Sequence, residues 1–234
     1  MDPPTLPGSH DISGPSAVSR GDQEGDQGGL VGALYPVNLV LRGRRCLVVG
    51  GGPVAGRKVA GLVEVGAEVH LVATEVSEAV RSIEGIHWEE RPYREGDVAG
   101  CWLVITCTDD PEVNAAVRRD GDAHGVWVNS ADDPTNCTAT LPAVIRQGPL
   151  VVTFSTSGEA PAVARWLRDA YGSTLGPEHC TLIELLAEAR REIKGQGRST
   201  EGMSWQEALD SGTLELIREG NLAEAKERLQ ACLS

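Results

Sequence analysis

Residues 46–58 read Cys46-Leu-Val-Val-Gly50-Gly51-Gly52-Pro53-Val54-Ala55-Gly56-Arg57-Lys58, an apolar run followed by a glycine cluster and a helical pattern. The pattern matches G-x-G-x-x-A, in which Gly50 allows a tight turn, Gly52 leaves room for a pyrophosphate and Ala55 lets the helix lie close to the strand. Free N–H groups at a helix start attract such an anion. The stretch therefore predicts a dinucleotide-binding strand-to-helix turn; a glycine turn without a ligand is the alternative.

Composition narrows the class of protein. The chain has 234 residues, enough for one large or two modest domains, and six cysteines without a C-x-x-C pair. Buried free thiols in a reducing cytoplasm are therefore expected, with no zinc cluster and no disulfide framework. A formal net charge of -13 argues against nonspecific nucleic-acid or membrane binding, and no export signal or membrane span is evident. An anionic ligand would need a local basic patch.

The order of predicted elements indicates the fold. Residues 1–33 are acidic and poor in large apolar side chains, which is typical of a flexible leader. Strands and helices alternate over residues 34–141, which predicts a Rossmann-type, doubly wound parallel sheet. A further strand over 149–155 and a helix over 160–171 fall in a segment spanning 142–175. Beyond it, residues 176–234 predict a helical C-terminal domain, with helices over 177–194 and 204–233 separated by a flexible break. The strands of the sheet are expected at 45–49, 68–73, 86–89, 102–106 and 126–129.

The second strand ends in Ala73-Thr74-Glu75, about twenty residues after the glycines. An acidic residue at this point binds the adenosine ribose of NAD, whereas a basic residue accommodates the 2′-phosphate of NADP. Because no Arg or Lys lies here, NAD is favoured. The alternative interpretation of Glu75 is a solvated, helix-capping side chain.

Polar clusters follow three strands, where parallel sheets bind ligands. They are Thr106-Cys-Thr108-Asp-Asp110, Asn129-Ser-Ala-Asp132-Asp133 and Ser155-Thr156-Ser157-Gly158. Asp132 is the candidate acid or base, with hydroxyls nearby to orient a substrate. Turn-making is the alternative for each cluster, and we expect it for Asp110, which caps the next helix, and for Asp133, because both precede proline. His124 is expected to pair with a helix C-terminus.

Three basic residues offer a site for a polyanion. Arg165 and Arg168 lie three apart on one predicted helix, and Arg146 precedes the last predicted strand. Together they could hold substrate carboxylates, although individually each fits a solvated helix or strand face. No histidine has a metal-ligand partner at helical or turn spacing, so no resident metal site is expected.

Taken in order, the motifs resemble a specific family. These are Tyr35-Pro-Val-Asn-Leu, Val48-Val-Gly-Gly-Gly-Pro-Val-Ala-Gly-Arg-Lys, Thr108-Asp-Asp-Pro-Glu-Val-Asn114, Val128-Asn-Ser-Ala-Asp132, Leu141-Pro-Ala and Ser155-Thr-Ser-Gly-Glu-Ala-Pro-Ala-Val-Ala-Arg165. Over residues 34 to about 190 they are similar to the precorrin-2 dehydrogenase/sirohydrochlorin ferrochelatase module of siroheme synthases. The last forty or so residues carry no such motif.

The resemblance implies NAD-dependent oxidation of precorrin-2 to sirohydrochlorin and a homodimer formed through residues 142–175. In some members it also implies insertion of Fe2+, a lyase reaction. The family's essential aspartate falls on Asp132. The expected nucleotide contacts are Gly50, Gly52, Pro53, Val54, Ala55, Thr74, Glu75 and Thr108, and the expected substrate contacts are Asn129, Thr156, Ser157, Arg146, Arg165 and Arg168. Thr156 replaces the family's modified serine, so regulation by serine modification is not implied.

Two other functions remain open at this stage. An NAD-sensing module would bind nucleotide and a protein partner without chemistry. An NAD oxidoreductase acting on another small anion would turn over without a tetrapyrrole. The discriminating residue is Asp132, because its removal would cost nothing in the first case.

Overall fold

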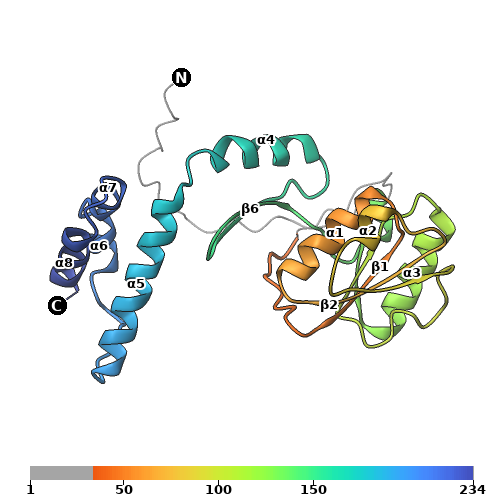
Figure 1. Cartoon of the computed structure of the whole chain (residues 1–234), viewed down its shortest axis with the longest axis horizontal. Helices are drawn as coiled ribbons and strands as arrows, with labels where there is room; N and C mark the ends of the chain where they lie inside the picture. The colour runs from red at the N-terminus through yellow and green to blue at the C-terminus, as the bar shows by residue number, and fades with distance from the viewer. Residues whose placement is uncertain (1–33, 234) are drawn as a thin grey trace, which may run out of the picture.

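The computed structural model describes residues 34–233, and its three parts follow one another along the long axis (Figure 1). A sheet domain is joined through a hairpin and a helix to a bundle of helices. The predicted leader over residues 1–33 lies outside the described residues. None of the helices over 34–233 is long and apolar enough to cross a membrane.

The sheet domain has five parallel strands in the order β3-β2-β1-β4-β5. The switch in strand order lies between β1 and β4, which is where a doubly wound sheet binds its ligand. This confirms the predicted Rossmann-type class. The bounds are β1 (Arg45–Val49), β2 (Glu68–Ala73), β3 (His87–Glu90), β4 (Leu103–Thr106) and β5 (Trp127–Ser130).

Apolar side chains on both faces of the sheet explain why helices cover both sides. Val48 packs with Ala55 and Val59 of helix α1 (Pro53–Glu64) on one face, together with Val80 of α2 (Glu78–Arg81). Leu47 packs on the other face with side chains that include Val117 of α3 (Pro111–His124). The alternation along one strand thus determines which helix covers which face.

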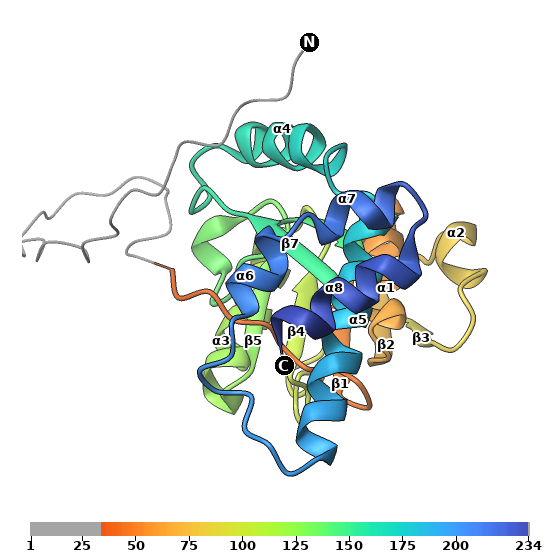
Figure 2. The same ribbon diagram turned by 90° about the vertical axis from the view of Figure 1, so that its left-hand side faces the viewer.

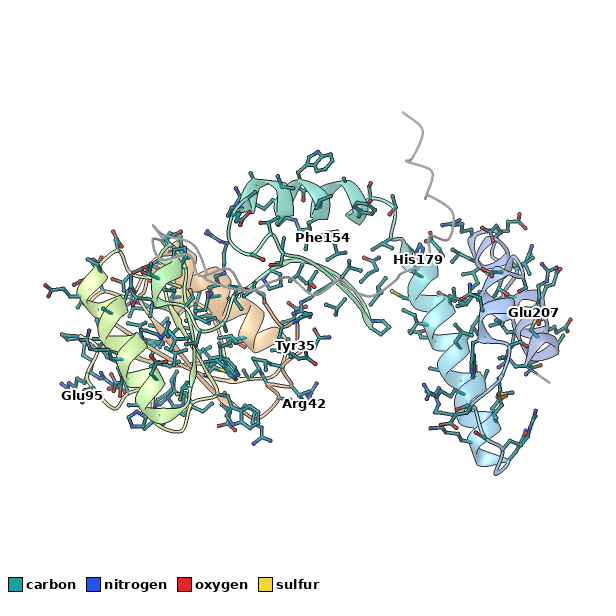
Figure 3. The ribbon with its side chains drawn as sticks, turned by 180° about the vertical axis from the view of Figure 1, so that it is seen from behind. Tyr35, Arg42, Glu95, Phe154, His179 and Glu207 are labelled. Atoms are coloured by element: carbon teal, nitrogen blue, oxygen red, sulfur yellow. The ribbon has the colours of Figure 1, made fainter. Side chains whose placement is uncertain are left out.

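The two strands that follow β5 form a separate sheet. Strand β6 (Ala143–Gln147) pairs antiparallel with β7 (Leu150–Phe154) through a turn at Gly148, whose φ is +53°. The sequence pattern predicts the strand at 149–155 but not its partner. Helix α4 (Pro161–Gly172) covers one side of this hairpin, where Phe154 meets Tyr171 with ring centroids 5.7 Å apart (Figure 3).

The C-terminal helices form a bundle with its own core. Helix α5 (Pro177–Gly195) packs against α6 (Trp205–Asp210), α7 (Thr213–Arg218) and α8 (Leu222–Cys232), as Figure 2 shows. The prediction of a single helix over 204–233 was wrong. Gly212 and Gly220 both have a φ of +81°, a left-handed conformation that interrupts a right-handed helix.

Candidate cofactor and active site

The glycine corner between β1 and α1 leaves no room for side chains at its first two positions. Gly50 has a φ of +118°, and a Cβ there would collide with the backbone carbonyl of Cys107, just after β4. A Cβ on Gly51 would collide with the carbonyl of Glu75, just after β2. The corner is therefore packed between the ends of two neighbouring strands. Sequence reasoning had assigned a reason for glycine at Gly50 but not at Gly51.

Gly52 and the start of α1 form an open anion cradle. A Cβ on Gly52 would meet no atom within 4 Å. The first turn of α1 carries no acidic side chain, and the N–H groups of Val54 and Ala55 have no acceptor among the described residues. Pro53 occupies the first helical position and Ala55 is fully buried. Free donors and the positive end of a helix dipole fit the pyrophosphate of a dinucleotide.

Thr74 and Glu75 flank this cradle at the end of β2. Both are exposed, and neither side chain forms a hydrogen bond or ion pair with the described residues. The N-cap of α2 is Ser77, so Glu75 does not cap that helix. The structure thus brings an uncommitted carboxylate to the side of the corner where a ribose would lie.

The loop after β4 is held by its own side chains. Thr106 donates to Ser130 Oγ at 2.8 Å, which joins the ends of β4 and β5. Asp110 accepts from the N–H groups of Glu112 and Val113, so its predicted capping role is confirmed. Thr108 is half-buried, and its Oγ1 accepts from the N–H of Asp110 at 3.2 Å. Thr108 lies beside the glycine corner, so atoms not engaged with Asp110 would make the proposed cofactor contact.

Two buried polar atoms among the described residues have no partner, and both belong to this edge of the sheet. Ser77, with an unpaired Oγ, donates its backbone N–H to Gly51 O at 3.0 Å. Asn114, with an unpaired Oδ1, donates its Nδ2 to Thr108 O at 3.1 Å. Neither residue is among the candidate site residues predicted from the sequence, although Asn114 ends one of the family motifs and a serine before a helix start is a local signal. Unpaired buried side-chain atoms are uncommon in native proteins.

Asp132 and Asp133 follow β5 but have different environments. Asp133 accepts hydrogen bonds from Thr135 and Asn136, both at 2.6 Å, and these hold the pKa of its carboxyl below the usual range. Asp132 is exposed and has no hydrogen bond or ion pair within residues 34–233. Asp133 therefore shapes the loop, as predicted, while no residue of 34–233 pairs with the Asp132 carboxylate.

Asn129, an expected substrate contact, is largely buried and uses its Nδ2 inside the protein. It is 6% exposed, and its Nδ2 donates to Ala139 O at 3.0 Å. The reason is its register: Asn129 pairs with buried Ile105 inside the sheet, before the strand ends. Asn129 supports the loop that carries Asp132. His124 lies at the predicted place, in the last turn of α3, and its Nδ1 is 3.1 Å from Asp120 Oδ1.

The remaining predicted substrate contacts lie in the turn after β7 and on α4. Thr156 Oγ1 accepts from the N–H of Ala160 at 3.2 Å, and Ser157 has a φ of +54°, the one positive value outside glycine in the described chain. Arg165 is exposed and has no partner among residues 34–233, and Arg168 pairs with Asp169 at 2.8 Å.

Arg146 does not join the other two arginines within one chain. Ile145 of β6 faces α4, where a Cβ on Gly172 would lie 3.9 Å from the Ile145 side chain. Because successive strand residues point to opposite faces, Arg146 points away from α4. The structure therefore separates it from Arg165 and Arg168, contrary to the joint cluster expected from the sequence. No group of three or more His, Cys, Asp or Glu side chains within residues 34–233 could hold a metal ion.

The fold and the corner define a dinucleotide-binding domain of the Rossmann type, and comparison with known proteins agrees. The model of the NAD_binding_7 family, described as "Putative NAD(P)-binding", matches residues 37–143. The chain is 35% identical over 203 residues to siroheme synthase of Nitrosococcus oceani, covering 85% of this chain and 43% of that protein. It is 36% identical over 200 residues to siroheme synthase of Azotobacter vinelandii, covering 83% and 43%.

A solved structure, SirC, precorrin-2 dehydrogenase, superposes with a TM-score of 0.64 at 26% identity, over 85% of this chain and 98% of that one. The chain belongs to the family that contains SirC and the siroheme synthases. It spans less than half the length of the siroheme synthases it matches. Its sheet domain is an NAD(P)-binding domain, in agreement with the predicted cofactor.

Proposed function

We propose that this chain catalyses the NAD-dependent oxidation of precorrin-2 to sirohydrochlorin, a step of siroheme biosynthesis. The observation that carries the proposal is the unpaired Asp132 carboxylate at the same sheet edge as the anion cradle at Gly52. Similarity to SirC, precorrin-2 dehydrogenase, over nearly the whole of that protein supports the choice of substrate.

The residues of the corner would hold NAD, which supplies the hydride acceptor when bound. Gly52, Pro53 and the free N–H of Val54 cradle the pyrophosphate, while Thr74 and Glu75 contact the adenosine ribose. Gly50 and Ala55 shape the cradle, and Thr108, in the loop after β4, contacts the cofactor. The absence of Lys and Arg beside Glu75 favours NAD over NADP.

Asp132 would act as the base. Loss of a hydride from the reduced macrocycle leaves a proton to be removed from a ring carbon or nitrogen, and an exposed carboxylate without a competing partner can accept it. The turn at Thr156 and Ser157, with Arg165 and Arg168 on the following helix, would orient the substrate's carboxylates.

The test is replacement of the base. We expect Asp132→Ala and Asp132→Asn to keep the affinity for NAD and to lower the turnover of precorrin-2 at least about a hundredfold, as for loss of a positioned base. The assay mixes protein, NAD and fresh precorrin-2 without oxygen and follows the visible absorbance of sirohydrochlorin. Asp109→Asn, an exposed carboxylate in the neighbouring loop, serves as the matched control.

Unchanged turnover in both Asp132 variants would reject the base. Saturable NAD binding without any oxidation would instead favour an NAD-sensing module, and turnover of another anion without a tetrapyrrole would favour a different oxidoreductase. Adding Fe2+ to the same assay tests iron insertion, in which Asp132 would help remove pyrrole protons and Fe2+ would be a substrate.

We also propose that two copies of the chain pair through residues 142–175. The face of the hairpin away from α4 carries Val144, Arg146 and Val151, and Val151 is 42% exposed. Below the hairpin in Figure 1, no other described element covers this face. A second copy would bury it and would bring a second Arg146 to the assembly.

A further inference from the structure

Helix α1 turns one flank toward the ends of β4 and β5. Its Ala55 faces the sheet, and a Cβ on Gly56 would lie 3.6 Å from Val80 of α2, so the Gly56 flank faces β2 and β3. A helix advances about 100° per residue, which puts Val54 and Lys58 on the opposite flank. That flank borders the side of the sheet where the proposed base lies.

Lys58 is a half-buried cation without a partner. It forms no ion pair and no hydrogen bond with residues 34–233, although the chain has 34 Asp and Glu against 21 Lys and Arg. Long helical side chains point back toward the helix N-terminus, so the ammonium leans toward the carboxyl edge of the sheet. The hydrocarbon stem can lie along the helix while the charge reaches that edge.

The electrostatics of Cys107 place Lys58 and Asp132 at one locality. Burial raises the pKa of the Cys107 thiol to about 11; the Lys58 ammonium opposes this rise, the Asp132 carboxylate adds to it, and the Arg57 guanidinium opposes it more weakly than Lys58. Cys107 follows β4, and a Cβ on Gly50 would collide with its carbonyl, so these charges act on a group beside the glycine corner. Lys58 is the half-buried cation at this locality, whereas Arg57 is exposed, and neither Lys58 nor Asp132 has a partner among residues 34–233.

We infer that Lys58 binds a carboxylate of the tetrapyrrole substrate and so positions the macrocycle against Asp132, an inference that rests on the proposed function. An acidic protein with a catalytic carboxylate repels a polycarboxylate, and an adjacent ammonium offsets that repulsion through a charge-assisted hydrogen bond. The substrate is favoured over the cofactor because Cys107 and Asp132 follow β4 and β5, whereas Thr74 and Glu75, on the ribose side, follow β2.

The experiment compares neighbouring charges. We expect Lys58→Gln to raise KM for precorrin-2 about tenfold or more, the loss expected for one hydrogen bond between charged groups. The Kd for NAD should change less than about twofold, and Lys58→Arg should restore most of the loss. Arg57→Gln removes the same charge from the adjacent, exposed position of the helix and should change KM by less than about threefold.

The outcomes separate the inference from the proposed function. If the unaltered protein fails to oxidise precorrin-2, the proposed function fails, and this inference with it. If the unaltered protein is active and Lys58→Gln keeps its KM, the inference alone fails. An equal rise in KM for Arg57→Gln, or a rise confined to the Kd for NAD, would also overturn it, because the lysine would then act through its general field or on the cofactor.

Discussion

Gly51 and Gly52 are adjacent and chemically identical, yet the structure uses them differently. The Cα of Gly51 faces the backbone of Glu75, so a side chain there would collide with that backbone and displace it. The Cα of Gly52 faces open space at the start of α1. The first glycine is thus needed for folding and the second for the close approach of a ligand.

This difference predicts two distinct phenotypes. We expect Gly52→Ala to leave the melting temperature within a few degrees of the parent and to weaken NAD binding about tenfold or more, because a methyl group would occupy the pyrophosphate position. Gly51→Ala should lower the melting temperature strongly. Thermal unfolding and NAD titration measure both effects, and tight NAD binding by Gly52→Ala would show that the cradle is not used.

Single residues also show how far sequence reasoning reaches. Gly50 and Asp110 were predictable because a local backbone rule requires them. The burial of Asn129 and the flank of α1 on which Lys58 lies were not predictable, since they depend on which side of a strand or helix meets a distant element. Whether Asn129 faces inward is decided by its pairing with Ile105, which lies 24 positions earlier.

At the scale of elements, no helix of the described chain connects β3 to β4, and an ion pair with further hydrogen bonds fixes this connection instead. Arg91 donates to Asp97 from two nitrogens, at 2.7 and 2.9 Å, and the N–H of Arg94 donates to the same carboxylate at 2.9 Å. Burial raises the pKa of Asp97, but these hydrogen bonds lower it more, so the pKa lies below its ordinary value. The ionised carboxylate therefore stabilises the folded state.

The sign of this shift fixes its pH dependence. A depressed pKa contributes stability above the unfolded value of 3.8, and that stability is lost as the pH falls through the folded pKa. We expect Asp97→Asn to lower the free energy of unfolding by about 1–3 kcal/mol at neutral pH, and by less near pH 3. Urea unfolding at both pH values measures it. The exposed Asp122→Asn should change stability by under about 1 kcal/mol, and a pH-independent loss in Asp97→Asn would contradict the account.

Among elements, local patterns located the strands of the sheet and the helices α4 and α5 to within a few residues. They missed β6, because Ala143–Gln147 mixes apolar and polar residues and becomes a strand only by pairing with β7. They merged α6, α7 and α8, because the apolar stripe continues across two glycines whose left-handed conformation is not visible in periodicity.

At the scale of the whole molecule, the uncovered face of the hairpin carries the proposed pairing of two copies. We expect Val151→Asp to convert the dimer to a monomer, because the substitution places a charge in an apolar contact. Light scattering after size-exclusion chromatography measures the mass. Leu222→Asp, at a 49% exposed position of α8, is the matched control and should keep the mass of the parent. If Val151→Asp remained a dimer, the proposed location of the interface would be wrong.

The apolar cores of the sheet domain and of the C-terminal bundle share no residue. Cooperative unfolding depends on contacts that fail together, and here each half has its own set. Heating such a chain should give two overlapping heat-absorption peaks rather than one. A nucleotide bound at the glycine corner would move only the peak of the sheet domain, since ligands protect only the part of a protein that they hold folded.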